Sequence, residues 1–129
     1  MAEAKSSSTS ATSAKPLIES DRVEGTTVYG AGGERIGRIK RLMIEKVSGQ
    51  VAYAVVEFGF WEIGEDDHTI PWGKLKYDTQ LHGYRTDITE AELRQSPGFA
   101  PDEEHDWSDR EREERLHDFY RIPPYWRAI

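Results

Sequence analysis

Histidines next to carboxylates are the first residues in this sequence that could do chemistry. They occur as Asp66-Asp67-His68, His105-Asp106 and His117-Asp118. A usable metal site needs at least three ligands that converge on one point. Neighbouring residues on a strand point to opposite faces, and neighbouring residues on a helix do not face each other. We therefore interpret these histidines and carboxylates as ordinary solvated side chains, and we expect no metal ion and no other cofactor.

A glycine-rich segment and several acidic pairs could also indicate catalysis. Gly30-Ala31-Gly32-Gly33 lacks the GK[ST] sequence and the strand–loop–helix context of a phosphate-binding loop, so we predict a hairpin turn. Adjacent carboxylates such as Glu65-Asp66 and Glu103-Glu104 are expected in a chain with 24 acidic residues. His82 has no catalytic partner close to it in the sequence. We therefore predict that the protein is not an enzyme.

Composition and charge narrow the possible partners and compartments. The chain has 129 residues, no cysteine and a net charge of −7, which disfavours nucleic acid as a direct partner. A chain without cysteine forms no disulfide, as is typical of a reducing cytoplasm. Residues 1–15 are mostly Ser, Thr and Ala, and we expect this head to be disordered. No segment approaches the roughly 20 apolar residues of a membrane span, so we predict a cytoplasmic protein without one.

The elements that would position a site lie between residues 16 and 100, where we predict one small β-domain. Strands are expected at Val23–Tyr29, Ile36–Val47, Gln50–Phe58, His68–Trp72 and Leu81–Asp87, with a helical turn over Gly73–Tyr77 and a short helix over Glu90–Gln95. Thr89 and Glu92 have the spacing of a capping box for that helix. Ser48-Gly49 predicts a tight hairpin between the second and third strands.

Two of these strands have unusual patterns. In the second, Ile36 and Ile39 are three residues apart, whereas Leu42 and Ile44 are two apart, so we predict a β-bulge near Arg38–Arg41. The third strand, Gln50–Phe58, has apolar side chains on both faces, as expected of a strand that is covered on both sides. One cover would be a barrel interior. The other would be a terminal segment or a second subunit.

A series of turns and apolar positions runs through the predicted β-domain. It comprises Thr27-Val28-Tyr29, Gly33-Glu34-Arg35-Ile36-Gly37, Ser48-Gly49-Gln50, Tyr53-Ala54-Val55-Val56 and Ile70-Pro71-Trp72 with Leu75. This series resembles the PRC-barrel domain, the fold shared by the cytoplasmic domain of the photosynthetic reaction-centre H subunit and the C-terminal domain of a ribosome-maturation factor. The resemblance covers roughly Leu17 to Phe99. It implies a mainly β fold, a small barrel of about five to six strands with a short helix and a C-terminal helical extension.

Residues 101–129 form an acidic tail that also carries aromatic residues. Ser108 and Glu111 have capping-box spacing, and the run from Asp109 to Arg121 predicts a helix that ends before Pro123-Pro124. Burying one large ring is worth roughly 1.5–3 kcal/mol, so we interpret this tail as a docking arm. It could cover its own barrel, or it could cross to a second subunit or another partner.

Large aromatic residues in the tail and in one polar loop are the candidate interaction residues. They are Phe60, Trp61, Trp107, Phe119, Tyr120, Tyr125 and Trp126. Together with the doubly apolar third strand, they favour a protein-interaction or scaffold module that associates with itself, most simply as a dimer, or with another protein. The chain is similar to stand-alone bacterial PRC-barrel proteins, since it lacks the membrane helix of the H subunit and an adjoining RNA-processing domain. The resemblance leaves two alternatives, an accessory role with the photosynthetic reaction centre and an adaptor role in ribosome assembly.

Overall fold

The structure, a computed structural model, describes residues 16–59, 67–96, 98–99 and 110–127. Its elements are α2 (Ser20–Val23), β1 (Thr27–Tyr29), β2 (Arg35–Ile44), β3 (Val51–Glu57), β4 (Asp67–Pro71), the 3-10 turn η2 (Trp72–Lys74), β5 (Lys76–Asp78), β6 (Gly83–Arg85), α3 (Glu90–Gln95), β7 (Gly98–Phe99), α4 (Arg110–Tyr120) and the 3-10 turn η3 (Tyr125–Arg127). The head predicted to be disordered, residues 1–15, lies outside the described residues.

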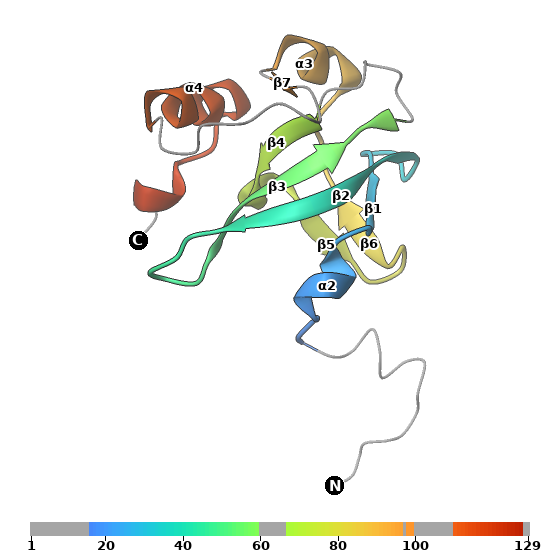
Figure 1. Cartoon of the computed structure of the whole chain (residues 1–129). Helices are drawn as coiled ribbons and strands as arrows, with labels where there is room; N and C mark the ends of the chain where they lie inside the picture. Colours follow the sequence, from blue (N-terminus) through green and yellow to red (C-terminus); the bar gives the residue numbers. More distant parts are fainter. Residues whose placement is uncertain (1–15, 60–66, 97, 100–109, 128–129) are drawn as a thin grey trace, which may run out of the picture.

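One seven-stranded sheet organises the described part of the chain, in the order β5-β6-β1-β2-β3-β4-β7 (Figure 1). Neighbouring strands are antiparallel except β1 and β6, which run parallel. Among the described residues no pairing joins the edge strands β5 and β7, so the sheet does not close. Figure 1 shows α3 and α4 at one end of the sheet and α2 at the other. The predicted mainly β fold with a short helix and a C-terminal helix is confirmed.

The predicted β-bulge in β2 is confirmed at Lys40. Ile39 lies opposite Val56 and Arg41 lies opposite Val55, which leaves Lys40 without a partner residue on β3. An extra residue of this kind bends a strand and increases its twist, as a curled sheet requires. The Lys40 ammonium reaches across β3 to the carboxylate of Asp67 on β4, at 3.1 Å.

Two glycines of the sheet occupy positions that disfavour any other residue. Gly33 has a φ of +87° in the predicted turn before β2, where its N–H donates to the Gly30 carbonyl at 3.0 Å. A Cβ on Gly37 would lie 2.5 Å from the backbone oxygen of Glu57. The first position needs the left-handed backbone that glycine allows, and the second needs the space that a missing Cβ leaves.

Four predicted strands are longer than the real ones, the third of them by one residue at each end. The first begins at Thr27, because Val23 ends α2 and Gly25 turns the chain at a φ of +85°. The second ends at Ile44, because Glu45 closes a hairpin loop: its N–H donates to the Gln50 carbonyl at 2.8 Å. This hairpin is predicted correctly, but its loop is wider than a tight turn.

The strand predicted over Leu81–Asp87 shortens to Gly83–Arg85. His82, which we placed on an edge strand, lies in the preceding turn at a φ of +58°, and its N–H donates to the Asp78 carbonyl at 2.8 Å. The strand is also not the last one, because α3 is followed by β7. Helix α3 has the predicted bounds, and its capping box joins Thr89 and Glu92 by reciprocal hydrogen bonds of 2.9 and 3.1 Å.

Strand β3 lies at the centre of the hydrophobic core. Its residues from Ala52 to Val56 are all buried, so the predicted covering of both faces is confirmed. Ala54 and Val56 pack with the other barrel strands, whereas Tyr53 contacts the C-terminal helix. The second cover of β3 in this structure is therefore α4 of the same chain.

Candidate functional site

The C-terminal helix α4 presents one face to the sheet. Its buried residues are Glu113, Leu116, His117 and Tyr120, which recur at helical spacing and so lie on one side of the helix. Leu116 and Tyr120 belong to the same hydrophobic core as the barrel residues. The helix predicted over residues 109–121 is confirmed as Arg110–Tyr120, while its predicted cap, Ser108, lies outside the described residues.

Three polar side chains meet between α4 and β3, and we call Tyr53, Glu113 and His117 the docking cluster. The Tyr53 hydroxyl donates to the Glu113 carboxylate at 2.6 Å, and its oxygen lies 2.9 Å from His117 Nε2. His117 Nδ1 faces the carbonyl oxygen of Ile122 at 3.3 Å. All three side chains are buried, so these hydrogen bonds form in a low-dielectric environment.

The hydrogen bonds of the docking cluster link α4 to β3 through one phenol. The Ile122 carbonyl can only accept, so we infer a proton on Nδ1 of His117. The Tyr53 hydroxyl, which donates to Glu113, lies between that carboxylate and the His117 ring.

The phenols at this contact resist ionisation. Burial raises the pKa of Tyr53, and the hydrogen bond from its hydroxyl to Glu113 raises that pKa further, because both disfavour the phenolate. Burial also raises the pKa of Tyr120 to about 12. Tyr125 shows the same direction, mainly because burial raises its pKa. These side chains therefore act as neutral hydroxyls at physiological pH.

Four of the seven predicted interaction residues lie at the contact between tail and barrel. They are Phe119, Tyr120, Tyr125 and Trp126. The Tyr125 ring packs edge-on to Tyr53 with centroids 5.7 Å apart, and the Arg110 guanidinium lies 3.8 Å from the centre of the Trp126 ring. The other three, Phe60, Trp61 and Trp107, lie outside the described residues.

The sequence analysis missed the docking cluster. We interpreted His117 as solvated, which is wrong because the side chain is buried against β3. A signal was present, since Glu113 and His117 are four residues apart and share a helical face with Leu116 and Tyr120. Polar side chains on an otherwise apolar face need buried partners, and the doubly apolar third strand offered one in Tyr53.

The prediction that the side chains of Asp67 and His68 are solvated is also wrong. Both residues belong to β4 and both are buried, Asp67 being only 1% exposed. Asp67 pairs with Lys40, and the His68 ring packs edge-on to Phe58 with centroids 5.7 Å apart. The reason is β7, an unpredicted strand that pairs with this end of β4 and removes its free edge.

Within the described residues, no group of three or more His, Cys, Asp or Glu side chains could hold a metal ion. No helix in the described ranges combines the length and the apolar character that crossing a membrane requires.

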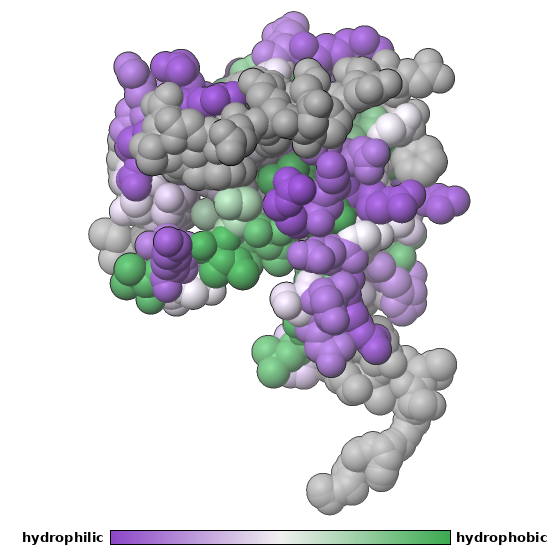
Figure 2. Space-filling model, viewed as in Figure 1, coloured by the Kyte–Doolittle hydropathy of each residue, from purple (hydrophilic) through white to green (hydrophobic). Residues whose placement is uncertain are grey.

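Apolar side chains remain uncovered at the tip of the hairpin that joins β2 and β3. Figure 2 shows hydrophobic side chains gathered over this end of the sheet. We call the residues Ile44, Val47 and Val51 the hairpin patch. Ile44 is 51% exposed and Val47 is 93% exposed, and Val51, which pairs with Ile44, is half-buried. A group of exposed apolar side chains of this kind is typical of a surface that contacts another protein.

Comparison with known proteins places most of this architecture in one family. A family model described as the PRC-barrel domain matches residues 16–93. The match includes β1 to β6 and ends before α4, so Tyr53 lies inside it and the other two docking-cluster residues lie beyond it. None of the curated proteins searched matches the chain.

Proposed function

The chain belongs to the PRC-barrel family, and from that premise we propose that it is a non-enzymatic protein-interaction module that pairs with a second copy of itself in the cytoplasm. PRC-barrel domains are generally non-catalytic modules. The proposed interaction is therefore one of surfaces, and the partner surface has to be apolar and accessible.

The hairpin patch is the observation that carries this proposal. Ile44 and Val47 both expose apolar side chains on the β2–β3 hairpin, and α4 covers a different part of β3. A symmetric dimer uses the same patch on both subunits, so a self-complementary apolar surface is sufficient to build one. Covering the patch would stabilise the dimer by roughly 25 cal/mol for each Å² of apolar surface that is removed from water.

The tail aromatics have a different part in this proposal. Tyr120 and Phe119 hold α4 on the barrel, where they are already packed against core residues. Tyr125 and Trp126 are half-buried at the edge of that contact, so they could add to a surface for a partner protein while remaining attached to the barrel. We propose that Phe60, Trp61 and Trp107 extend this second surface.

Sedimentation analysis of the full chain tests the self-association. We expect a dimer at about 100 µM, a concentration at which weak interfaces of small area are populated. The double variant Ile44→Ser/Val47→Ser is expected to be a monomer at the same concentration. Tyr77→Ser is the matched control, because it removes an apolar side chain that is 43% exposed on β5, away from the hairpin.

Two results would contradict the proposal. A monomeric wild-type chain at this concentration would refute self-association. A dimer that survives the double variant, or that is lost equally in Tyr77→Ser, would show that the hairpin patch is not the interface.

A further inference from the structure

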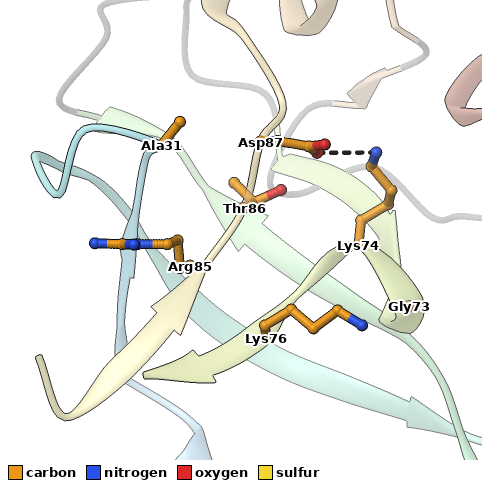
Figure 3. A pocket seen from close by; sticks show the side chains of 7 residues that line it. All are labelled: Ala31, Gly73, Lys74, Lys76, Arg85, Thr86 and Asp87. Atoms are coloured by element: carbon orange, nitrogen blue, oxygen red, sulfur yellow. Dashed lines mark ion pairs between the residues drawn. The ribbon is translucent and has the colours of Figure 1, made fainter. Parts of the chain in front are cut away.

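A second surface feature, independent of the hairpin patch, lies where β5 and β6 meet the turn before β2. A cavity of about 310 Å³ opens there (Figure 3). Its lining residues are Ala31, Gly73, Lys74, Lys76, Arg85, Thr86 and Asp87, which we call the basic pocket. The volume is at the lower end of the range of small-molecule sites, so the pocket fits a compact ligand.

The charge of the basic pocket is opposite to that of the whole protein. Lys74, Lys76 and Arg85 supply three cations and Asp87 supplies one carboxylate, so the lining has a formal charge of +2 in a chain of −7. A net-negative surface repels long polyanions such as RNA beyond the pocket. A small anion is affected mainly by the local positive charge, because charges farther than roughly 10 Å are screened at physiological salt.

The cations of the pocket are held in different ways. The Lys74 ammonium pairs with the Asp87 carboxylate at 2.9 Å, and this interaction lowers the pKa of Asp87. The Arg85 guanidinium is 3.7 Å from Asp78, at the outer limit of an ion pair. Among the described residues Lys76 has no ion-pair partner. Lys76 is therefore free to pair with a bound anion.

Thr86 gives the pocket a buried hydrogen-bond donor. The residue is 3% exposed, and its Oγ1 accepts the N–H of Ile88 at 3.3 Å, which leaves the hydroxyl proton to be donated. Figure 3 shows the Thr86 hydroxyl on the side of the pocket where Lys74 and Lys76 lie, while Arg85 extends to the other side. A pocket that holds a hydroxyl donor and two lysine ammonium groups offers suitable partners for a doubly charged anion.

We propose that the basic pocket binds the phosphate group of a small phosphorylated molecule. The phosphate oxygens accept from Thr86, Lys74 and Lys76, and Arg85 on the other side of the pocket contacts the remainder of the ligand, so that the whole lining, with its formal charge of +2, favours an anionic molecule. The site goes beyond the proposed self-association, because the pocket and the hairpin patch share no residue.

Titration of the full chain with glycerol 3-phosphate tests this site by NMR. We expect saturable shifts of the backbone amide signals of Thr86 and Asp87, with sodium chloride at equal ionic strength giving none. Lys76→Gln should weaken binding at least tenfold, since it removes the unpaired cation and leaves the ion pair of Lys74 intact. Lys46→Gln is the matched control, because it makes the same change of charge in the exposed β2–β3 loop and should change the affinity less than twofold.

A lipid headgroup offers the same phosphate chemistry, so vesicles form the second arm. Co-sedimentation would use phosphatidylcholine vesicles with and without about one fifth phosphatidic acid, a composition that adds negative surface charge. Binding that depends on Lys76 in either arm supports the phosphate site and identifies whether the phosphate is free or lipid-borne. The proposal is overturned if neither probe binds, or if Lys76→Gln and Lys46→Gln weaken binding equally.

Discussion

Two regions of the β2–β3 hairpin differ in what covers them. At Tyr53 the hairpin is covered by α4, and the contact contains a hydrogen-bonded set of buried polar groups. At Ile44 and Val47 the same hairpin is uncovered and apolar. Intramolecular contacts are commonly expected to be the apolar ones. Here the intramolecular contact combines apolar packing with a set of buried polar side chains, whereas the open surface carries apolar side chains alone.

This difference in polarity determines how specific each of the two surfaces is for what it contacts. Buried hydrogen bonds have strict requirements of distance and direction, so the docking cluster favours one position of α4 on β3. Apolar contact is non-directional and depends mainly on area, so the hairpin patch accepts any complementary apolar surface. A tail that occupies one position and a surface that accepts complementary apolar partners thus use different interactions.

The largest effect on stability is expected where α4 packs on the core. Tyr120→Ala should lower the free energy of unfolding by about 3 kcal/mol, because it removes a buried ring and leaves a cavity between α4 and the core. Tyr77→Ala, the same change at an exposed position, should cost less than about 1 kcal/mol. Urea denaturation of both variants measures the contrast. Equal losses would mean that α4 contributes no more to stability than an exposed side chain does.

The second-largest effect is expected at high pH, which should weaken the contact between α4 and the core. Tyr120 has a pKa raised to about 12, whereas an unfolded tyrosine ionises near 10. The neutral Tyr120 hydroxyl therefore makes its full contribution to the free energy of unfolding below pH 10. As the pH rises from 10 to about 12, this contribution of roughly 2–3 kcal/mol is lost. The free energy of unfolding measured across this range should fall more steeply for the wild type than for Tyr120→Phe, which has no phenol to ionise there. Parallel curves would assign the loss to other groups.

A smaller effect is expected from a single hydroxyl of the docking cluster. Tyr53→Phe should lower the free energy of unfolding by about 2 kcal/mol, because Glu113 and His117 would lose the group that joins them while staying buried. Tyr84→Phe is the control, since its ring is also buried but its hydroxyl has no hydrogen bond to another described residue. It should change stability by less than about 0.5 kcal/mol. If Tyr53→Phe left the free energy of unfolding unchanged, the docking cluster would not be what holds the tail on the barrel.

The smallest effect on folding is expected at the hairpin patch. Val47→Ser should change the stability of the monomer by less than about 0.5 kcal/mol, because the side chain is 93% exposed in the absence of a partner. The measurement is urea denaturation at a concentration low enough to dissociate any dimer. A large loss of stability would mean that Val47 packs within its own chain, and the contrast between the two regions would disappear.

The barrel could be predicted from the sequence, because its signals are local. The glycine turn before β2, the capping box of α3 and the broken apolar spacing around Lys40 each lie within a few neighbouring residues. The docking cluster could not be predicted, because it joins Tyr53 to two residues of α4 that lie 60 and 64 positions further along the chain. Local patterns say which side of a helix is buried, but they do not say which strand buries it.

The basic pocket was missed for the same reason. Its lysines and Arg85 come from η2, β5 and β6, and the sequence shows them as scattered charges in an acidic chain. The error at Asp67 and His68 differs in kind: β7 is only two residues long, too short for a periodic pattern, yet it covers the edge of β4. Elements of this length are set by tertiary packing and leave no clear trace in the sequence.

The parallel pairing of β1 with β6 has a consequence for how the protein folds. Val28 pairs with Gly37 on one side and with Tyr84 on the other, so one strand joins the earliest and the late parts of the barrel. Strands β1 to β4 can form by local hairpins, whereas the pairing of β1 with β6 must wait for a long loop to close. During synthesis from the N-terminus, one edge of β1 therefore stays unpaired until β6 has been made. We expect this joint to set the folding rate.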